Sequence, residues 1–336
     1  MILPNGHSTL YLSNILDGKI KKGLGIGCDF DNHFLHKQGE LNILLGHDNV
    51  GKTYWGEWYF LVLAVTHGLK FTIFMDENDA WKVMRDLIQM WLGKPFENCT
   101  HQEVRSAEAL MEYHFNFIDN RQRYTPKELT DVWLSSETET LLIDPFNGLK
   151  TPFSYSENYE VLNDLKMINK REGKTIYINA HPSSASGRSQ GFHPKGHSFE
   201  GYLKPPFKDD IEGGKPFTNK ADNFMIAHRY TQHEQMRHIT TIAVAKIKDT
   251  FTGGSPTLKD KEVYFEYNHG NGFIINGIDP MPRKGAKSYD EQKEEFQAKL
   301  LSDETELHRI NNNLNIKPNA EFETEYDKNK PSDLPF

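Results

Sequence analysis

The chain has 336 residues, which is long enough to bury one large core or one core with appendages. Hydrophobic residues make up 37% of it and the mean hydropathy is -0.66, as is typical of a soluble protein. The net charge of -8 argues against a broadly basic coat for nucleic acid, although a narrow basic channel is compatible with it.

Cysteine content and apolar runs indicate the compartment. Only Cys28 and Cys99 are present, too few for a disulfide framework and too far apart in sequence for a pair of metal ligands. The N-terminus has no basic region ahead of an apolar one, and the longest apolar stretch, residues 59–65, is far too short to span a bilayer. We therefore expect a cytoplasmic protein without a membrane part.

Residues 1–22 are expected to form an N-terminal arm. Ser8 has the side chain of a helix cap, and the helix that comes after it is expected to continue to residue 20, with lysines near its end that suit the helix dipole. The apolar residues of this helix either pack on the chain's own domain or dock on a neighbouring subunit. The sequence leaves both interpretations open.

A short apolar run, residues 41–45, leads into a loop of the pattern G-x-x-x-x-G-K-[ST]. The two glycines let the backbone wrap closely, so that its N–H groups face phosphates. The lysine of this pattern reaches the β- and γ-phosphates, and its hydroxyl residue holds Mg²⁺. The loop therefore predicts binding of a nucleoside triphosphate by Gly46, His47, Asp48, Asn49, Val50, Gly51, Lys52 and Thr53.

Two later apolar runs of strand length end in carboxylates. One ends at Asp76 and Glu77, and the other ends at Asp144. Carboxylates at the carboxyl ends of parallel strands lie where ligands bind. Because Asp144 comes after a complete phosphate loop, we expect it to bind the nucleotide's Mg²⁺ through water, with Thr53 as the other metal residue.

Strands and helices alternate over most of the chain. Helices are expected at residues 79–92, 103–113, 126–134 and 160–171, and strands at residues 114–118, 174–180, 221–230 and 238–248. Residues 263–274 are expected to form a hairpin that closes the sheet. This alternation predicts an α/β fold with a mainly parallel sheet flanked by helices.

Residues 183–220 form a long stretch rich in glycine, serine and proline, and such loops inside a domain are usually functional. Its first part, residues 183–208, interleaves basic and aromatic side chains and has Glu200 as its only acid. Cations on phosphates and rings against bases suit a nucleic-acid single strand. The predicted DNA-binding residues are Arg188, Lys195 and Lys204.

We expect three parts along the chain: the arm at residues 1–22, the α/β domain at residues 23–282, and a charged helix with a disordered tail at residues 283–336.

Six segments, in this order along the chain, resemble the RecA-like motor domain of the ring-shaped replicative DNA helicases of superfamily 4. They are GHDNVGKT, FMDEN, LLIDPFNGL, INAHP, NKADNFMIAHR and AVAKIK. The phosphate loop is common to many ATPases, whereas IDPFN with AHP and NKADN is more specific and resembles the Twinkle-like and phage branch of these DnaB-like enzymes. The resemblance covers residues 23–277 and implies a RecA-like P-loop core in a bacterial or phage-infected cell.

The resemblance implies roles for residues at matching positions. Glu77 would be the general base, while the side chain of Asp76 should point to the other face of the strand. His181 has the position of the family's sensor between the γ-phosphate and the DNA loop. Lys246 and Lys248 match a lysine and an arginine finger that reach the neighbouring subunit's nucleotide.

Lysine at position 248 departs from the family pattern, because it has the charge but not the planar fork of donors. Either Lys248 does a weaker form of this work, or Arg229 or another arginine replaces it. The departure concerns the catalytic rate more than the fold.

The leading hypothesis is a hexameric helicase that uses ATP, or another NTP or dNTP, with Mg²⁺ to translocate on single-stranded DNA and unwind duplex. One alternative is a RecA-like recombinase filament, and another is a DNA-binding ring or loader that hydrolyses ATP weakly. Only about 22 residues precede the motor, so a separate primase is expected as a partner. The last residues, SDLPF, resemble the tip by which bacterial single-strand-binding proteins dock on replication partners, although an incidental chain end remains the other interpretation.

Overall fold

The computed structural model describes residues 2–20, 22–151, 154–184 and 191–283, together with residues 287, 291–292, 294–295 and 297–298. The chain divides into two compact units, Met1–Tyr289 and Asp290–Phe336, and the sheet with its helices belongs to the first unit. The tail expected after residue 310, with its SDLPF tip, lies outside the described residues. So does Arg188.

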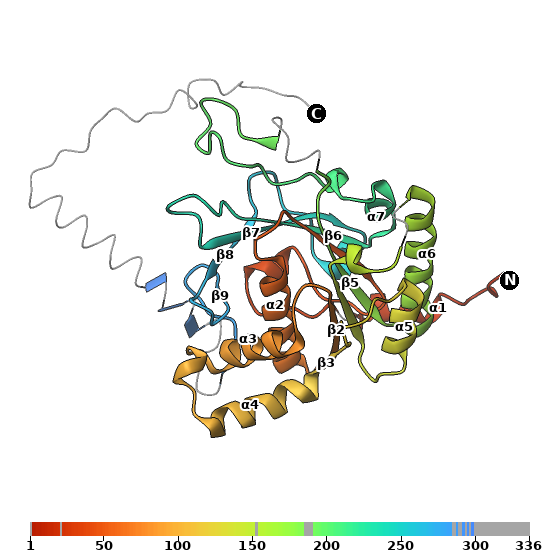
Figure 1. Ribbon diagram of the computed structural model, residues 1–336. Coiled ribbons are helices and arrows are strands. Elements are labelled where there is room, and N and C mark those ends of the chain that lie inside the picture. The colour runs from red at the N-terminus through yellow and green to blue at the C-terminus, as the bar shows by residue number, and fades with distance from the viewer. Residues whose placement is uncertain are drawn as a thin grey trace, which may run out of the picture. The chain divides into compact units, whose positions relative to one another are not determined.

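A nine-stranded sheet forms the centre of the first unit, with the strand order β3-β2-β4-β5-β1-β6-β7-β8-β9 (Figure 1). The pairs from β3 across to β6 are parallel, and β7, β8 and β9 continue the sheet in antiparallel fashion. The strands are β1 (Leu41–Leu45), β2 (Phe71–Met75), β3 (Phe115–Phe117), β4 (Thr140–Asp144), β5 (Thr175–Ala180), β6 (Asn223–His228), β7 (Ile239–Ile247), β8 (Val263–Tyr267) and β9 (Phe273–Ile274).

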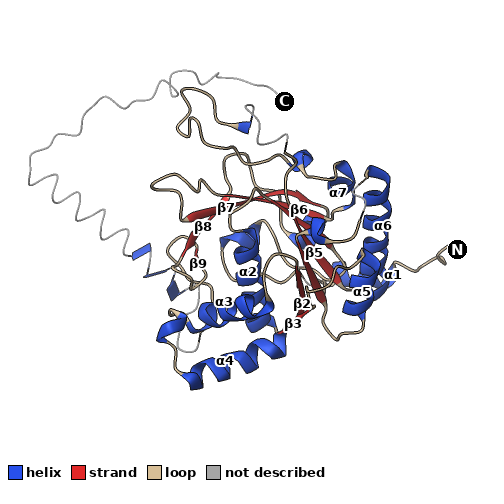
Figure 2. Ribbon diagram, in the orientation of Figure 1, coloured by secondary structure: helices blue, strands red, loops and turns tan. Residues whose placement is uncertain are grey.

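Helices cover both faces of this sheet (Figure 2). The α-helices of the first unit are α1 (Thr9–Leu16), α2 (Lys52–His67), α3 (Ala80–Leu92), α4 (His101–His114), α5 (Pro126–Leu134), α6 (Tyr155–Glu172), α7 (Lys215–Lys220) and α8 (Thr250–Gly253). The α/β prediction with a mainly parallel sheet and a P-loop core is therefore confirmed.

Two apolar cores lie on opposite faces of the sheet because successive strand side chains alternate between faces. In β1, Leu41, Ile43 and Leu45 belong to the core beneath α5, α6 and α7, whereas Leu44 belongs to the core beneath α2, α3 and α4. All residues of β1 are buried. A strand between two helical layers needs such a continuous apolar run, which is why β1 could be read from the sequence.

Two helices begin earlier than the sequence indicated because side chains cap them. The expected start of α4 was residue 103, but Thr100 and Glu103 form a capping box, with the Thr100 N–H donating to Glu103 Oε2 at 2.8 Å. The expected start of α6 was residue 160, but Ser154 accepts a hydrogen bond from the Glu157 N–H and the helix begins at Tyr155.

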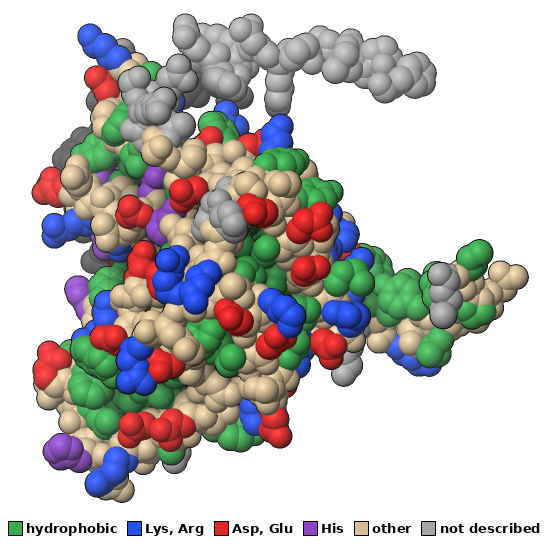
Figure 3. Space-filling view, turned by 45° about the vertical axis from the view of Figure 1, so that its right-hand side comes forward, with side chains coloured by type: hydrophobic (Ala, Val, Ile, Leu, Met, Phe, Trp, Pro, Cys, Tyr) green, Lys and Arg blue, Asp and Glu red, His purple; other side chains and the backbone are tan. Residues whose placement is uncertain are grey.

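The N-terminal helix is shorter than expected. It ends at Leu16, because Gly18 with a φ of 65° cannot continue it, and Ser8 precedes it without a side-chain capping bond. None of the residues of α1 is buried, and Leu10 and Leu16 are 74% and 87% exposed. In Figure 3 the N-terminal segment projects at the right, with hydrophobic side chains over much of it. Of the two interpretations, docking on another surface is the one that this exposure favours.

Residues 183–220 are not entirely irregular, since they include α7, which the sequence analysis missed. Pro216 stands in the first turn of this short helix, and Phe217 is buried beside Phe146. No helix among the described residues is long and apolar enough to cross a membrane.

His36 makes the stability of this core dependent on pH. Its ring is 1% exposed and stacked on Tyr177, and its Nδ1 lies 2.9 Å from the Tyr177 hydroxyl. Burial lowers the pKa of His36 to about 3. The folded state therefore keeps the ring neutral at pH values where the unfolded chain takes up a proton.

We expect the free energy of unfolding to fall as the pH drops below about 6.5, by up to about 1.4 kcal/mol per pH unit for this one group. His36→Gln should flatten that dependence, measured by urea denaturation between pH 7 and pH 5. Equal slopes for the wild type and H36Q would show that His36 is not the group responsible.

Candidate nucleotide site

The phosphate loop connects the end of β1 to the start of α2 and requires glycine at both ends. A Cβ on Gly46 would lie 2.7 Å from the Ala227 carbonyl oxygen of β6. Gly51 has a φ of 89°, in the left-handed region that favours glycine. The loop therefore lies against β6 and turns directly into the N-terminus of α2.

Lys52 lies inside this loop. Its buried ammonium group donates hydrogen bonds to the carbonyls of Gly46 at 2.7 Å and His47 at 2.8 Å. Burial lowers the pKa of Lys52, and the carboxylates of Asp144, Asp48 and Glu77 oppose that shift. The positive charge of Lys52 is thus held at the centre of the loop, beside the carbonyls of Gly46 and His47.

Thr53, in the first turn of α2, contacts Asp144, the last residue of β4. The Thr53 hydroxyl donates to Asp144 Oδ2 at 2.6 Å. Burial raises the pKa of Asp144, while hydrogen bonds from Thr53 and Asn179 and the charge of Lys52 oppose that shift. A hydroxyl and a carboxylate oxygen are ligands that Mg²⁺ prefers, so this pair fits the predicted metal residues.

No group of three or more His, Cys, Asp or Glu within the described ranges could hold a metal ion. Mg²⁺ bound at Thr53 and Asp144 would therefore take most of its ligands from phosphate and water, as is usual for this ion at nucleotide sites.

A cavity of about 970 Å³ opens beside these residues, and Glu77 and His181 line it together with Lys52 and Asp144. Glu77 comes after β2, while the side chain of its neighbour Asp76 packs on Gly148, where a Cβ would lie 2.5 Å from that of Asp76. His181 comes after β5, and its Nδ1 lies 2.7 Å from Asp48 Oδ1 outside hydrogen-bond geometry. Three separate strand ends thus supply side chains to one cavity.

Arg229 also lines this cavity, and its Nη2 donates to the Asn49 carbonyl of the phosphate loop. The sequence analysis considered Arg229 as a replacement for a finger that reaches a neighbour. Its guanidinium group instead contacts the chain's own phosphate loop.

Lys246 and Lys248 lie at the opposite edge of the sheet. β7 runs antiparallel to β6, so Lys246 at its end pairs with Phe224 near the start of β6. Lys246 donates to the carbonyls of Thr218 at 2.9 Å and Ala221 at 2.6 Å. Neither lysine lines the chain's own nucleotide cavity.

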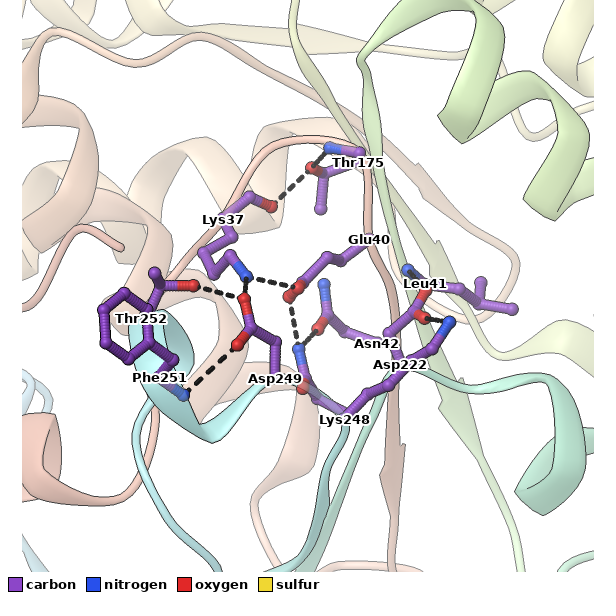
Figure 4. A network of polar contacts seen from close by, with 12 residues as sticks. Lys37, Glu40, Leu41, Asn42, Thr175, Asp222, Lys248, Asp249, Phe251 and Thr252 are labelled. Atoms are coloured by element: carbon purple, nitrogen blue, oxygen red, sulfur yellow. Dashed lines mark hydrogen bonds and ion pairs between the residues drawn. The ribbon is translucent and has the colours of Figure 1, made fainter. Parts of the chain in front are cut away.

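Lys248 belongs to a polar network at this edge, shown in Figure 4. Its ammonium group lies 3.0 Å from Asp222 Oδ1, which also binds Lys166 at 2.8 Å. The other oxygen of Asp222 accepts the backbone N–H of Leu41 at 3.1 Å. The hydrogen bond and charge of Asp222 raise the pKa of Lys248, so this side chain remains a cation.

Of the basic loop after β5, the structure describes residues 183–184 and 191–208. Lys195 is exposed and Lys204 is half-buried. Two of the aromatic residues expected to meet bases are instead packed on Tyr230: Phe199 stacks on its ring at 4.1 Å, and Tyr202 approaches it edge-on at 6.0 Å.

Known proteins resemble this chain in sequence and in fold. No protein-family model matches the chain. The "Twinkle homolog protein, chloroplastic/mitochondrial" of Arabidopsis thaliana is 23% identical over 247 residues, which are 67% of this chain and 33% of that protein. The chain thus spans about a third of the length of this relative.

Solved structures extend the comparison. One of them, an ATPase domain, has a TM-score of 0.65 at 12% identity, covering 81% of this chain and 99% of that one. A DnaB-like replicative helicase, in a structure that concerns its interactions with primase, has a TM-score of 0.62 at 12% identity, covering 82% of this chain and 67% of that one. These likenesses show the fold, which is that of a RecA-like ATPase domain, and membership of the DnaB-like and Twinkle-like enzymes stays a prediction. The chain's place in the phage branch stays a prediction as well.

This RecA-like domain holds functional candidates that the sequence analysis missed. Glu57 on α2 and Lys82 and Asp86 on α3 line the nucleotide cavity. Burial raises the pKa of Glu57 well above its ordinary value, and the charges of Asp86 and Asp144 act in the same direction. Glu57 stands four residues after Thr53, so the only signal in the sequence was its position one helical turn beyond the predicted metal residue.

The close approach of Gly46 to β6 yields a prediction for the RecA-like domain. Gly46→Ala should displace the phosphate loop and weaken binding of a fluorescent ATP analogue by about 10-fold or more. The reason is that the backbone N–H groups of the loop would no longer point at the phosphates.

Gly56→Ala is the matched control, since no atom lies within 4 Å of a Cβ at this position of α2. It should keep nucleotide affinity and raise the free energy of unfolding by up to about 1 kcal/mol. Wild-type affinity in G46A would contradict the assigned role of this contact.

Proposed function

We propose that this chain is the motor of an ATP-dependent replicative DNA helicase, which assembles as a hexameric ring and translocates on single-stranded DNA. The observation that carries the proposal is the convergence of Lys52, the Thr53–Asp144 pair and Glu77 on one cavity at the carboxyl edge of the sheet. This set supplies phosphate binding, metal support and a carboxylate for a water molecule.

Each residue has a distinct part in the proposed hydrolysis of ATP, or of another NTP or dNTP. Lys52 holds the β- and γ-phosphates, and Thr53 and Asp144 hold Mg²⁺, which neutralises charge on the phosphates when bound. Glu77 accepts a proton from the attacking water. His181 faces the same cavity and joins it to the loop that comes after β5.

The distance between the two lysines near the end of β7 and the phosphate loop, which lie at opposite edges of the sheet, supports assembly as a ring. Lys246 and Lys248 lie at the amino edge of the parallel strands, and their own phosphate loop lies at the carboxyl edge. These cations can therefore complete a nucleotide site only on a neighbouring subunit. The exposed apolar residues of α1 supply a second surface for contact between subunits.

Single-stranded DNA is the proposed track, bound by Arg188, Lys195 and Lys204 of the loop that comes after β5. The exposed Lys195 and the exposed rings of Phe192 and Phe207 support this role. A separate primase and other replication proteins are proposed partners through the C-terminal tip.

A weakly hydrolysing ring or loader is the second candidate, and the pairing of Lys248 with Asp222 favours it. A finger that is a lysine, and that already has an acidic partner, is a weaker source of transition-state charge than a free arginine.

Two assays on one preparation test the proposal: ATP hydrolysis with and without single-stranded DNA, and displacement of a strand from forked duplex. A helicase shows DNA-stimulated hydrolysis together with displacement, whereas a loader shows DNA binding with little of either. Electron microscopy with nucleotide separates closed rings from recombinase filaments.

The position of Glu77 predicts a separation of binding from chemistry. Glu77→Gln should keep nucleotide affinity and lower turnover by about 100-fold or more, because only the proton acceptor is lost. Asp76→Asn is the matched control and should retain turnover, since Asp76 packs on Gly148. An inactive D76N beside an active E77Q would reverse the assignment.

Subunit mixing tests the role of Lys248. K248A and K52A proteins should each be nearly inactive, and their mixture should regain part of the ATPase activity, because one type of interface then has both working halves. Lys195→Ala serves as the mixing control, since it alters neither half. Wild-type turnover in K248A alone would remove Lys248 from the mechanism.

A further inference from the structure

Two successive residues at the end of β6 contact two different functional segments. Arg229 reaches the phosphate loop, and Tyr230 packs on residues 191–204, which we call the hairpin segment. We propose that the Arg229–Tyr230 pair is a positioning element that transmits the nucleotide state of the phosphate loop to the hairpin segment. This inference rests on the proposed function, in which the hairpin segment carries Lys195 and Lys204 to the DNA.

The hairpin segment has an ordered backbone. An antiparallel bridge joins its two sides, and the His193 N–H donates to the Tyr202 carbonyl at 2.9 Å. The Lys204 N–H donates to the Gly191 carbonyl at 2.7 Å. A force on one side chain of this segment therefore moves both of its sides, including the backbone of Lys204.

Tyr230 holds the hairpin segment by three contacts. Its ring is stacked on Phe199 with 4.1 Å between centroids and 8° between planes. Its hydroxyl group lies 2.9 Å from His193 Nε2, and Tyr202 meets its edge at 84°. Aromatic stacking at this distance and a hydrogen bond together fix both the position and the rotation of the segment.

The other side of the pair grips the phosphate loop. Arg229 donates to the carbonyl of Asn49, a residue whose φ of 61° places it in the left-handed region at the tip of the loop. A second contact is direct, because the ring of His47 lies within hydrogen-bond reach of the Lys204 backbone. The first contact joins the phosphate loop to the Arg229–Tyr230 pair, and the second joins the loop directly to the hairpin segment.

The geometry of β6 makes this connection stiff. The strand is paired on both sides, with β1 and with β7, and its last two residues, Ala227 and His228, are buried. Arg229 and Tyr230 are adjacent residues directly after this strand, so the contact with the Asn49 carbonyl and the contact with Phe199 are separated by a single peptide bond and no flexible linker. Coupling between sites requires such a physical connection and is typically worth a roughly 5- to 150-fold change in affinity.

Hydrogen–deuterium exchange tests the connection without any DNA. In the wild type, ADP with Mg²⁺ or a non-hydrolysable ATP analogue should change the exchange rate of peptides covering residues 191–204 by about 5-fold or more. In Y230A most of that change should disappear, since only the direct contact of His47 with the Lys204 backbone remains, while nucleotide still binds because Tyr230 does not line the cavity. Y230F keeps the stack on Phe199 and should retain most of the response.

Tyr113→Ala, which removes an exposed tyrosine on α4, is the matched control and should behave as the wild type. Thermal unfolding of each variant is measured beside exchange. If Y230A fails to fold, Phe199→Ala removes the same stack from the hairpin side, with the same expectation. A nucleotide response that persists at its wild-type size in Y230A or F199A, or no response in the wild type, would overturn the proposal.

A second measurement separates this proposal from the proposed function. Y230A should keep basal ATPase activity and lose most of the stimulation by single-stranded DNA, whereas Y230F should keep it. If the wild type shows the exchange response without DNA stimulation, the helicase proposal fails and the connection stands. If DNA stimulates the wild type and Y230A equally, the connection fails and the helicase proposal stands.

Discussion

The burial of β1 between β5 and β6 is the constraint on which the nucleotide site depends. All of its residues are enclosed, and parallel neighbours on both sides fix its register. The phosphate loop is therefore a continuation of a strand that is fully buried and paired on both sides. Gly46 meets the Ala227 carbonyl of β6, so the loop starts against a rigid surface. The contact with β6 keeps the backbone N–H groups of the phosphate loop in place, so they need not rearrange when phosphate binds.

The same strand connects the two edges of the sheet. At its amino end, the Leu41 N–H is held by Asp222, which also pairs with Lys248; at its carboxyl end is the phosphate loop. The residue proposed to act on a neighbour and the loop that binds the chain's own nucleotide thus share one short, stiff element. In a ring, β1 of each subunit would connect its own nucleotide site to the site of the neighbour that its Lys248 reaches.

Local chemistry made much of the fold predictable from the sequence. Each parallel strand of the core was visible as a mainly apolar run, and the carboxylates after β2 and at the end of β4 could be placed from where those runs end. Helix starts were less accurate at α4 and α6, because capping by Thr100 and Ser154 is decided by one side chain each. The helix α7 was missed because a six-residue helix within a glycine- and proline-rich stretch has almost no periodicity.

Contacts between distant segments could not be read from the sequence either. Nothing in the order of residues shows that Phe199 stacks on Tyr230 rather than remaining available to a base. A carboxylate on a buried helix face, such as that of Glu57, has meaning only once α3 brings Asp86 near it.

The sharing of Asp222 between two lysines has a consequence for how a subunit could lend a cation to its neighbour. Removing one partner from a buried ion pair usually leaves an uncompensated charge, which is strongly unfavourable. Here Lys166, with its side chain only 16% exposed, lies 2.8 Å from Asp222 and would still balance its charge if Lys248 moved away. Two cations thus surround one carboxylate, and the more exposed lysine is the surplus charge. Lys248 could therefore exchange Asp222 for the phosphates of a neighbouring subunit's nucleotide without leaving a buried carboxylate unpaired and destabilising this edge of the sheet.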